Sequence, residues 1–483
     1  MGKEILNYKP TDVWKHFYAL TQLPRPSRHE GKVIKYIQDF AIQLGLGYHI
    51  DEVGNIVVSK PATKGKENHR GVILQSHVDM VPQKNSDKVH NFETDPIETL
   101  IDGEWLKANQ TTLGADNGIG CAAMLAILES TSTKHGPLEA LFTINEEAGM
   151  DGAFGLKGGV LKGQVLINLD SEDEGELFIG CAGGLNVQAN SSYQSVAPES
   201  GKAFEIIIKG LKGGHSGLDI NLGRGNSNKI MGRLLWSALN NLSVQVASLK
   251  GGDLRNAIPR EAHAIVIIPE IFVNDLKSFI SRFTENLKEE LKHTEPGLSI
   301  ELVAVDVPSK VISPADAMRL IGVLNAAPSG AMRMSDVMPG LVETSLNLSI
   351  VRIENEEAEF TYLVRSSIDT AKYAVGEKLS ALHSITGFEL NFSGDYPGWS
   401  PNRESYVLKV CSDTYQKLFN KTPGLLAIHA GLECGIIGGK YHGLDMISFG
   451  PTIRSPHSPD EKVHIASVDK FYDFLKATLE AIG

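Results

Sequence analysis

The sequence predicts an α/β protein in which a mostly parallel sheet, covered by helices, is interrupted by an inserted α+β domain. In residues 1–185, short runs rich in Val, Ile and Leu alternate with helical stretches, which is typical of a sheet buried on both faces. Residues 186–386 instead carry strands with one polar face, and the α/β pattern resumes in residues 387–483. We therefore expect one domain in two parts, with residues 186–386 as a separate insert.

The apolar runs of the first part are short enough to be strands, and several of them end in polar residues. The predicted strands are NIVVSK (55–60), GVILQSH (71–77), LEALFTINEE (138–147) and QVLINLD (164–170). The stretch NGIGCAAMLAILES (117–130) predicts the helix between two of them. Ser27 and Glu30, three positions apart, predict a capping box at the start of another helix over 27–45.

The insert has a different pattern of apolar and polar residues. Its amphipathic strands, with helices interleaved, predict an open antiparallel sheet: AFEIIIKGL (203–211), EAHAIVIIP (261–269), LNLSIVRI (346–353) and FTYLVRSS (360–367). Two long helices are predicted over 226–239 and 273–293. The last part then offers a helix over 403–420, a strand over 443–451 and a closing helix over 467–482.

The composition excludes several classes of function. Lys and Arg number 46 against 58 Asp and Glu, a net charge of −12, so nucleic acid is not an expected partner. With 42% hydrophobic residues and no apolar stretch of membrane-spanning length, the chain is typical of a soluble globular protein. Its four cysteines are scattered and form no CxxC pair, which indicates a reducing compartment. We expect a cytoplasmic protein with no membrane partner.

His77 and Asp79 stand two positions apart where the run GVILQSH ends. Side chains two apart on a strand leave from the same face, so the imidazole and the carboxylate point out together. For the pair alone, two interpretations are open. It is either a hydrogen-bonded histidine at a strand end, or a metal ligand with the acid that orients it.

Other chain segments near strand ends also carry metal-competent residues, and some have a simpler explanation. Asp116, in TTLGADNGIG, precedes a helix and could serve as its N-cap. Glu146 and Glu147 follow a strand, where a solvated acidic loop is the alternative. Asp170 ends the run VLINLD, and His457 stands between two prolines that fix the backbone around it.

Taken together, these donors predict a metal centre. Open α/β sheets bind ligands outside the carboxyl ends of their strands, and carboxylates gathered there repel one another unless a cation is bound. Two histidines and three acids, one of them able to bridge, make a set for two metals: His77, Asp116, Glu147, Asp170 and His457. Mixed imidazole and carboxylate ligands favour two Zn²⁺ per chain, with Co²⁺ or Mn²⁺ as substitutes.

Such a centre predicts hydrolytic chemistry. Two metals about 3.5–4 Å apart can share a hydroxide and polarise a carbonyl together. Asp79 then fixes the tautomer of His77 through its other ring nitrogen. Glu146, beside Glu147, is placed to take a proton from the metal-bound water and deliver it to a leaving amine. We therefore expect Asp79 and Glu146 to be catalytic.

Seven blocks of the chain resemble the signature blocks of a known family. They are, in order, SHVDMV, GADNGIG, NEEAGMDGA, NLDSED, GLKGGHSGLDI, NAIP and SPHSPDE. They are similar to those of the dinuclear zinc exopeptidases, which include aminoacylases, peptidase T and carnosinases, and the match covers nearly the whole chain. The chain length, INEEAGMDGA and HAGLECG resemble most the members that cleave Xaa-His dipeptides.

The resemblance implies a role for each matching position. It makes Asp116 the bridging ligand and agrees with the other ligands and catalytic residues named above. In the insert, which the family uses as a lid, His215 matches a histidine that stabilises the tetrahedral oxyanion, often across a dimer interface. Asn256 and Arg365 match positions that hold the substrate's carbonyl or terminal carboxylate. Without the resemblance, His215 is a turn histidine and Arg365 a charge at a strand end.

Two further expectations concern the substrate and the assembly. Glu433, in HAGLECG, either binds a free substrate amine or is simply an acid at a helix start. His429 and His464 are expected to be structural. Because the family's counterpart of His215 is often supplied by a partner, we expect a homodimer formed through the insert.

The leading hypothesis is a dipeptidase that hydrolyses Xaa-His dipeptides, such as carnosine-like substrates, by a zinc-bound hydroxide with Glu146 as general base. A tripeptide aminopeptidase or an N-acyl amino acid deacylase would use the same chemistry. A third hypothesis, a catalytically silent metal-binding or assembly protein, predicts a missing ligand or base, yet every expected position is filled.

Overall fold

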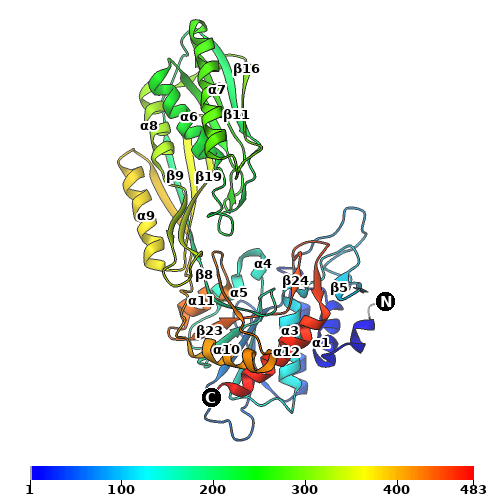
Figure 1. Ribbon diagram of the computed structural model, residues 1–483. Helices are drawn as coiled ribbons and strands as arrows, with labels where there is room; N and C mark the ends of the chain where they lie inside the picture. The colour runs from blue at the N-terminus through cyan, green and yellow to red at the C-terminus, as the bar shows by residue number, and fades with distance from the viewer. Residues whose placement is uncertain (1–2) are drawn as a thin grey trace. The chain divides into compact units, whose positions relative to one another are not determined.

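The computed structural model describes residues 3–483, which divide into two compact units (Figure 1). Unit 1 comprises the residues up to Gly180, together with Pro401–Ala427 and Leu432–Gly483. Unit 2 comprises Cys181–Ser400 and Ile428–Gly431. The contacts thus divide the chain near residues 180 and 400, where the sequence pattern had suggested 185 and 386.

Unit 1 is built on an eight-stranded mixed sheet with a parallel centre. In spatial order its strands are β1 (Gly47–Ile50), β2 (Ile56–Lys60), β6 (Leu138–Thr143), β3 (Val72–His77), β7 (Val165–Asn168), β23 (Asp445–Ser448), β8 (Glu176–Cys181) and β22 (Gly424–Ile428). Strands β6, β3, β7 and β23 run parallel to one another. Every residue of β3 and β7 is buried, as expected for strands covered on both faces.

The helices of unit 1 pack around this sheet. They are η1 (Lys3–Asn7), α1 (Thr11–Thr21), α2 (Gly31–Gln43), α3 (Ala115–Glu129), α4 (Glu146–Gly149), α5 (Asp151–Gly155), α10 (Tyr406–Phe419), α11 (Glu433–Lys440) and α12 (Ile465–Ala481). Helix α3 is apolar all round and lies between β3, α1 and α12 (Figure 1). A helix with no polar face needs such cover on every side, and this fixes where its first turn lies.

A small antiparallel sheet completes unit 1. Its strands, in order, are β24 (Ile453–Arg454), β25 (Lys462–His464), β5 (Trp105–Ala108) and β4 (Thr99–Asp102). It therefore joins the segment before α3 to the segment before α12, although these lie far apart in the chain.

Unit 2 is an α+β unit with a nine-stranded antiparallel sheet. The strands, in order, are β16 (Ser299–Val305), β11 (Lys202–Lys209), β15 (Ala262–Ile268), β13 (Gln245–Gly251), β19 (Val342–Glu354), β20 (Glu357–Ser366), β9 (Gly183–Ser192) and β21 (Glu389–Tyr396), with β18 (Gly330–Met334) also on β19. Because β21 pairs along β9, it belongs to this sheet rather than to unit 1. Two short ladders pair β10 (Ser195–Val196) with β17 (Val311–Ile312), and β12 (Gly214–His215) with β14 (Ala257–Ile258).

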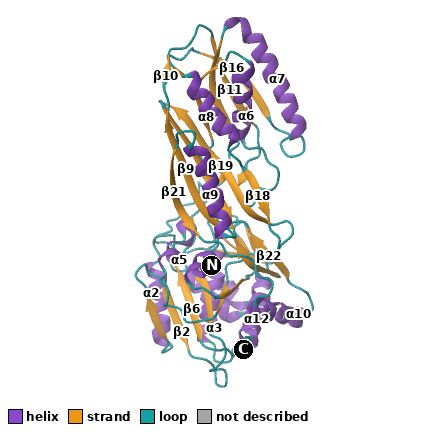
Figure 2. Cartoon of the chain, turned by 90° about the vertical axis from the view of Figure 1, so that its left-hand side faces the viewer, coloured by secondary structure: helices purple, strands orange, loops and turns teal. Residues whose placement is uncertain are grey.

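Helices cover one face of the unit 2 sheet (Figure 2). They are α6 (Ser227–Asn241), α7 (Val273–Glu290), α8 (Pro314–Ala326) and α9 (Asp369–Ser384), and η2 (Glu270–Phe272) leads into α7. Alternate residues of β11, such as Phe204, Ile206 and Ile208, join the core under the helices, whereas Glu205 and Ile207 are only half-buried. The predicted fold class, a covered mixed sheet with a separate antiparallel α+β unit, is confirmed.

None of the helices in residues 3–483 combines the length and the apolar composition that crossing a lipid bilayer requires.

Candidate metal centre

Three neighbouring parallel strands of unit 1 deliver predicted ligands to one edge of the sheet. Strand β3 ends at His77 itself. On its two sides, β6 leads to Glu147 in α4, and β7 ends two residues before Asp170. Since parallel strands end at the same edge, these three side chains converge as the sequence pattern predicted.

Two further predicted ligands come from loops. Asp116 lies in the first turn of α3, where its φ and ψ of −78° and 111° are not helical. Its carboxylate oxygens pair with His77 and His457 rather than with a backbone N–H of the helix, and Gly114 occupies the cap position, so Asp116 is not a simple N-cap. His457 lies between β24 and β25, with a left-handed φ of 58°.

The five side chains form two groups that share Asp116. His77 Nε2 lies 3.1 Å from Asp116 Oδ1 and 3.3 Å from Asp170 Oδ1. His457 Nε2 lies 3.2 Å from the other oxygen, Asp116 Oδ2, and 2.9 Å from Glu147 Oε2. Each group thus holds one imidazole and one carboxylate of its own, with one oxygen of Asp116 facing each imidazole. Both groups are compact enough to hold a metal ion.

The electrostatics of the pocket favour positive charge at both imidazoles. Burial lowers the pKa of His77, but its carboxylate neighbours outweigh burial and hold that pKa well above its ordinary value. Hydrogen bonds to Asp116 and Glu147 raise the pKa of His457 to about 11. Burial raises the pKa of Asp170 to about 6, although His77 opposes the rise. A pocket that holds positive charge this strongly is suited to cations.

The candidate ligand atoms also suit divalent metal ions. The Oε1 atom of Glu147 is buried and has no hydrogen-bond partner among the described residues, which leaves it free to act as a ligand. Two imidazoles and three carboxylates are the ligands that Zn²⁺ prefers when cysteine is absent. His457 is the most exposed of the five, with 52% of its side chain accessible, so the pocket opens to solvent on its side.

Asp79 contacts both His77 and the turn that carries Glu146 and Glu147. Its Oδ1 lies 3.3 Å from Nδ1 of His77, on the ring side opposite the metal group. The backbone N–H groups of Glu146 and Glu147 donate to the same carboxylate, at 3.0 and 3.2 Å. Asp79 is fully buried, so this one side chain orients two predicted ligands and the predicted base.

The predicted capping box at Ser27 and Glu30 is wrong. Glu30 is itself the residue before α2, and neither side chain caps that helix. Ser27 Oγ instead donates to Asp79 Oδ2 at 2.8 Å, and Glu30 Oε1 accepts from the N–H of Asn145 at 3.0 Å. Glu30 thus binds the turn that precedes Glu146, and Ser27 binds the carboxylate of Asp79 that holds this turn.

Glu146 begins α4, and its carboxylate is close enough to His77 and Glu147 to form a third compact group with them. Burial raises the pKa of Glu146 well above its ordinary value, and the carboxylates of Asp170 and Glu433 add to the rise. A carboxyl group whose proton affinity is raised in this way can both accept and release a proton.

Glu433 is a buried acid in the first turn of α11, so it does lie at a helix start, as one of the two interpretations proposed. Its Oε2, however, accepts hydrogen bonds from Gln75 Nε2 at 2.6 Å and Thr143 Oγ1 at 2.8 Å, on β3 and β6. Its Oε1 is buried without a hydrogen-bond partner among the described residues, and burial raises its pKa to about 7.

The remaining predicted substrate-binding residues lie in unit 2. His215 accepts hydrogen bonds at Nδ1 from the N–H groups of Gly217 and Leu218, at 3.2 and 3.1 Å. The ring proton therefore resides on Nε2, which is left to donate. Burial and the nearby Arg365 guanidinium lower the pKa of His215, so the ring is neutral near pH 7. Asn256 is exposed on the adjacent loop, and its carbonyl accepts from Ser216 N–H.

Arg365, on β20, has a second histidine beside it that the sequence pattern did not single out. Burial and the charge of Arg365 lower the pKa of His429 to about 3, and His429 Nε2 lies 2.7 Å from Ser345 Oγ. Arg365 donates to the hydroxyl of Tyr396 at 3.1 Å and is itself buried. A neutral histidine beside a buried arginine makes His429 a member of the His215–Arg365 cluster, whereas His464 caps α12.

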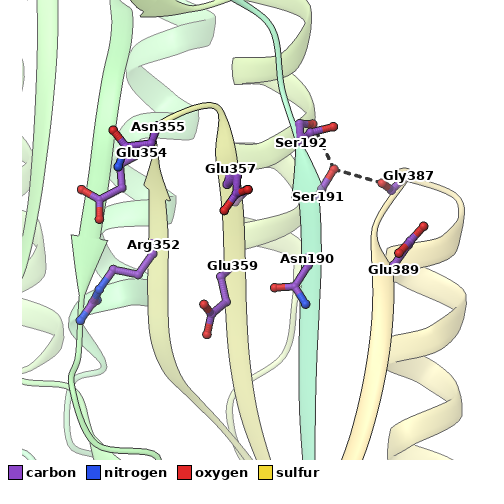
Figure 3. Close-up of a pocket in the computed structure, with 11 residues that line it drawn as sticks. Asn190, Ser191, Ser192, Arg352, Glu354, Asn355, Glu357, Glu359, Gly387 and Glu389 are labelled. Carbon is purple, nitrogen blue, oxygen red and sulfur yellow. Dashed lines mark hydrogen bonds between the residues drawn. The ribbon is translucent and has the colours of Figure 1, made fainter.

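A separate acidic hollow of about 650 Å³ lies in unit 2 beside the turn between β19 and β20 (Figure 3). Its charged lining consists of Arg352, Glu354, Glu357, Glu359 and Glu389. Within residues 3–483, the groups of side chains compact enough to hold a metal all lie in unit 1, so this hollow is not a second candidate.

Residues 73–481 match the model of peptidase family M20/M25/M40. The cytosol non-specific dipeptidase of Escherichia coli is 46% identical over 480 residues, which are 99% of either chain. The aminoacylhistidine dipeptidase of Vibrio alginolyticus is also 46% identical, and its crystal structure matches with a TM-score of 0.95 over 99% of this chain and 98% of that chain.

A more distant structure shares the fold alone. The aminopeptidase PepT of Bacillus cereus matches with a TM-score of 0.58 at 16% identity, over 98% of this chain and 99% of that chain. The resemblance read from the seven sequence blocks is therefore confirmed: the chain belongs to peptidase family M20/M25/M40.

Proposed function

We propose that this protein is a metal-dependent dipeptidase with two cation sites in unit 1. The observation that carries the proposal is the position of Asp116, whose two oxygens face two imidazoles, each with a further carboxylate beside it. Relatives that are 46% identical over nearly the whole chain are named as dipeptidases.

His77, Asp170 and Asp116 would hold one ion, and His457, Glu147 and Asp116 the other. We propose Zn²⁺ as the native ion because the set mixes imidazoles and carboxylates. Bound ions would supply Lewis-acid chemistry, polarising the substrate carbonyl and making water a better nucleophile.

Glu146 is the general base and acid of the proposed reaction. Its carboxylate accepts a proton from the attacking water as the new C–O bond forms, and then donates it to the nitrogen of the leaving amine as the peptide C–N bond breaks. Asp79 contributes by fixing the N–H groups of Glu146 and Glu147 and the ring of His77. Burial of Glu146 keeps its proton affinity high enough for both steps.

Unit 2 supplies groups for the rest of the substrate. His215, neutral and with its proton on Nε2, donates to the oxygen that becomes negative in the tetrahedral intermediate. Arg365 binds the terminal carboxylate, since a guanidinium forms paired hydrogen bonds to carboxylates, and Asn256 binds a carbonyl. In unit 1, Glu433 binds the free amine through its unpaired Oε1. We also propose that unit 2 is the lid and mediates a homodimer.

The substrates are dipeptides, with Xaa-His dipeptides among them. Two relatives that are 46% identical differ on this point, because one is named non-specific and the other aminoacylhistidine dipeptidase. The Escherichia coli relative is named as a cytosolic protein, and we propose the same compartment for this chain. A tripeptide aminopeptidase or a deacylase remains the alternative that a substrate panel separates.

Removal of metal tests the proposal. Protein treated with a chelator and then dialysed should lose hydrolysis of Xaa-His and other dipeptides, and Zn²⁺ or Co²⁺ should restore it. The same preparations are assayed on tripeptides and N-acyl amino acids, which should be poor substrates. Dipeptide hydrolysis that survives complete metal removal would contradict the metal-dependent mechanism, and a clear preference for tripeptides or acyl amino acids would contradict the substrate class.

His215→Ala should lower kcat about 10²–10³-fold, because one oxyanion donor is lost, while metal content stays unchanged. The matched control is His263→Ala. His263 is another half-buried histidine of unit 2, paired with Glu205 on the sheet, and it should leave kcat near wild type. Equal kcat for His215→Ala and wild type would remove His215 from the reaction.

A further inference from the structure

Glu461 is a fully buried carboxylate of unit 1 that none of the roles above uses. Only 2% of the residue is exposed. Its Oε2 accepts hydrogen bonds from the N–H groups of Leu113 and Gly114, at 2.7 and 2.9 Å. Its Oε1 accepts from those of Ala115 and Asp116, at 2.7 and 3.2 Å. One side chain thus binds four consecutive backbone amides, the last of which belongs to the shared metal ligand.

The start of α3 needs this partner. The first N–H groups of a helix have no acceptor within the helix, and Gly114 at the cap position has no side chain to provide one. Asp116 also departs from helical geometry, so its backbone is not held by the regular helix pattern. The Glu461 carboxyl group therefore takes the place of a cap.

The backbone of Glu461 lies close in sequence to a second predicted ligand, His457. Glu461 follows His457 by four residues, and its own N–H donates to the carbonyl of Ser458 at 2.9 Å. Strand β25, which begins at Lys462, pairs with β5 and so fixes the backbone directly after Glu461. Glu461 therefore joins the segments that carry Asp116 and His457, the two side chains that face each other at 3.2 Å.

Arg25 also binds this segment, through a backbone carbonyl rather than through N–H groups. This buried guanidinium donates to the carbonyl of Gly114 at 2.5 Å and to those of Val78 and Asp79 at 2.8 and 3.1 Å. Gly114 has a left-handed φ of 68°, and an added Cβ would lie 2.6 Å from the guanidinium. The carbonyl and the N–H of Gly114 are thus both bound by buried side chains, which restricts where segment 113–116 can lie.

We propose that Glu461 is a positioning residue of the metal centre, which places the shared ligand Asp116 opposite His457 by binding the amides of residues 113–116. The proposal rests on the function proposed above. In this proposal Glu461 contacts neither the substrate nor the ions. A change at Glu461 should therefore lower metal affinity first, and the rate of the chemical step only through the loss of metal.

Glu461→Gln tests the proposal, because the amide group has one acceptor oxygen where the carboxylate has two. Two of the four N–H groups then face an NH₂ group. The metal-free variant is titrated with Co²⁺ at mildly alkaline pH and followed by visible absorption. The apparent affinity should fall about 10–100-fold, as for other groups that orient ligands. Excess Co²⁺ should restore a large part of kcat, which a general loss of folding would not allow.

Glu139→Gln is the matched control. The Oε2 of Glu139 accepts two backbone N–H groups, from Lys162 and Gly163, both at 2.8 Å, away from the metal ligands. One amide oxygen can accept both, so this variant should titrate like wild type. Glu461→Asp, which keeps both oxygens on a shorter side chain, should fall between wild type and Glu461→Gln, and it replaces Glu461→Gln if that variant does not fold.

The outcomes are distinguishable. A folded Glu461→Gln that binds Co²⁺ with wild-type stoichiometry and affinity would overturn the positioning role. So would a fall in kcat that excess Co²⁺ leaves unchanged. If wild-type protein itself binds no Co²⁺ and hydrolyses no dipeptide, the proposed function fails rather than the role of Glu461.

Discussion

Glu146→Gln should lower kcat about 10²–10⁴-fold while two ions per chain remain bound. The amide cannot accept a proton from water, yet it has nearly the shape of the acid. The backbone N–H of residue 146 still donates to Asp79, so the turn before α4 keeps its position. Because the loss concerns only proton transfer, KM for a dipeptide should change much less than kcat. Steady-state kinetics and metal analysis of the same preparation measure both quantities.

Glu129→Gln is a suitable control for this variant. Glu129 ends α3 in the same unit, where it pairs with Lys15 and His16, outside the candidate centre. It should show wild-type kcat. Full activity of Glu146→Gln with metal retained would show that another group moves the proton.

Asp116→Ala should have the largest effect on metal binding, because both groups of ligands lose a member at once. Each ion would keep one imidazole and one carboxylate, which is fewer than the three protein ligands typical of catalytic zinc sites. Metal content should fall below one ion per chain, and kcat should fall at least about 10²–10⁴-fold as several kcal/mol of transition-state stabilisation are lost.

Asp170→Ala provides the contrast. Of the two imidazoles, Asp170 contacts that of His77, so its loss should weaken one ion and spare the site of His457 and Glu147. Metal analysis after dialysis should therefore give about one ion per chain for this variant. Equal metal loss in the two variants would contradict the shared role of Asp116.

The metal groups could be predicted from sequence because their positions follow from strand ends. His77, Glu147 and Asp170 come directly at or after buried parallel strands, and parallel strands end at one edge. His457 and Asp116 lie outside the parallel strand ends. Their residue types, the prolines beside His457, the helix after Asp116 and the family blocks pointed to them. The structure brings the five together as two compact groups that share Asp116.

Other features of the site could not be predicted because they depend on contacts distant in sequence. Ser27 and Glu30 have the spacing of a capping box, yet they bind Asp79 and the turn before Glu146. Glu461 looks like one more acid in SPHSPDE, and only the packed structure shows that it lies against residues 113–116. His429 is likewise recognised as part of the His215–Arg365 cluster only because it lies near Arg365, more than sixty positions earlier in the chain.

The domain boundaries also depend on contacts between residues that are distant in sequence. Residues 387–400 carry no strong signal of a domain change, and the strand β21 could have extended either unit. Its pairing with β9 places it in unit 2, and this is a non-local fact that composition does not encode.

Crystals of the wild-type protein soaked with Zn²⁺ and measured by anomalous diffraction test the central claim most directly. We expect two peaks per chain, one flanked by His77 and Asp170, the other by Glu147 and His457, with Asp116 in contact with both. A single peak, or zinc bound elsewhere while these five side chains remain without it, would contradict the account.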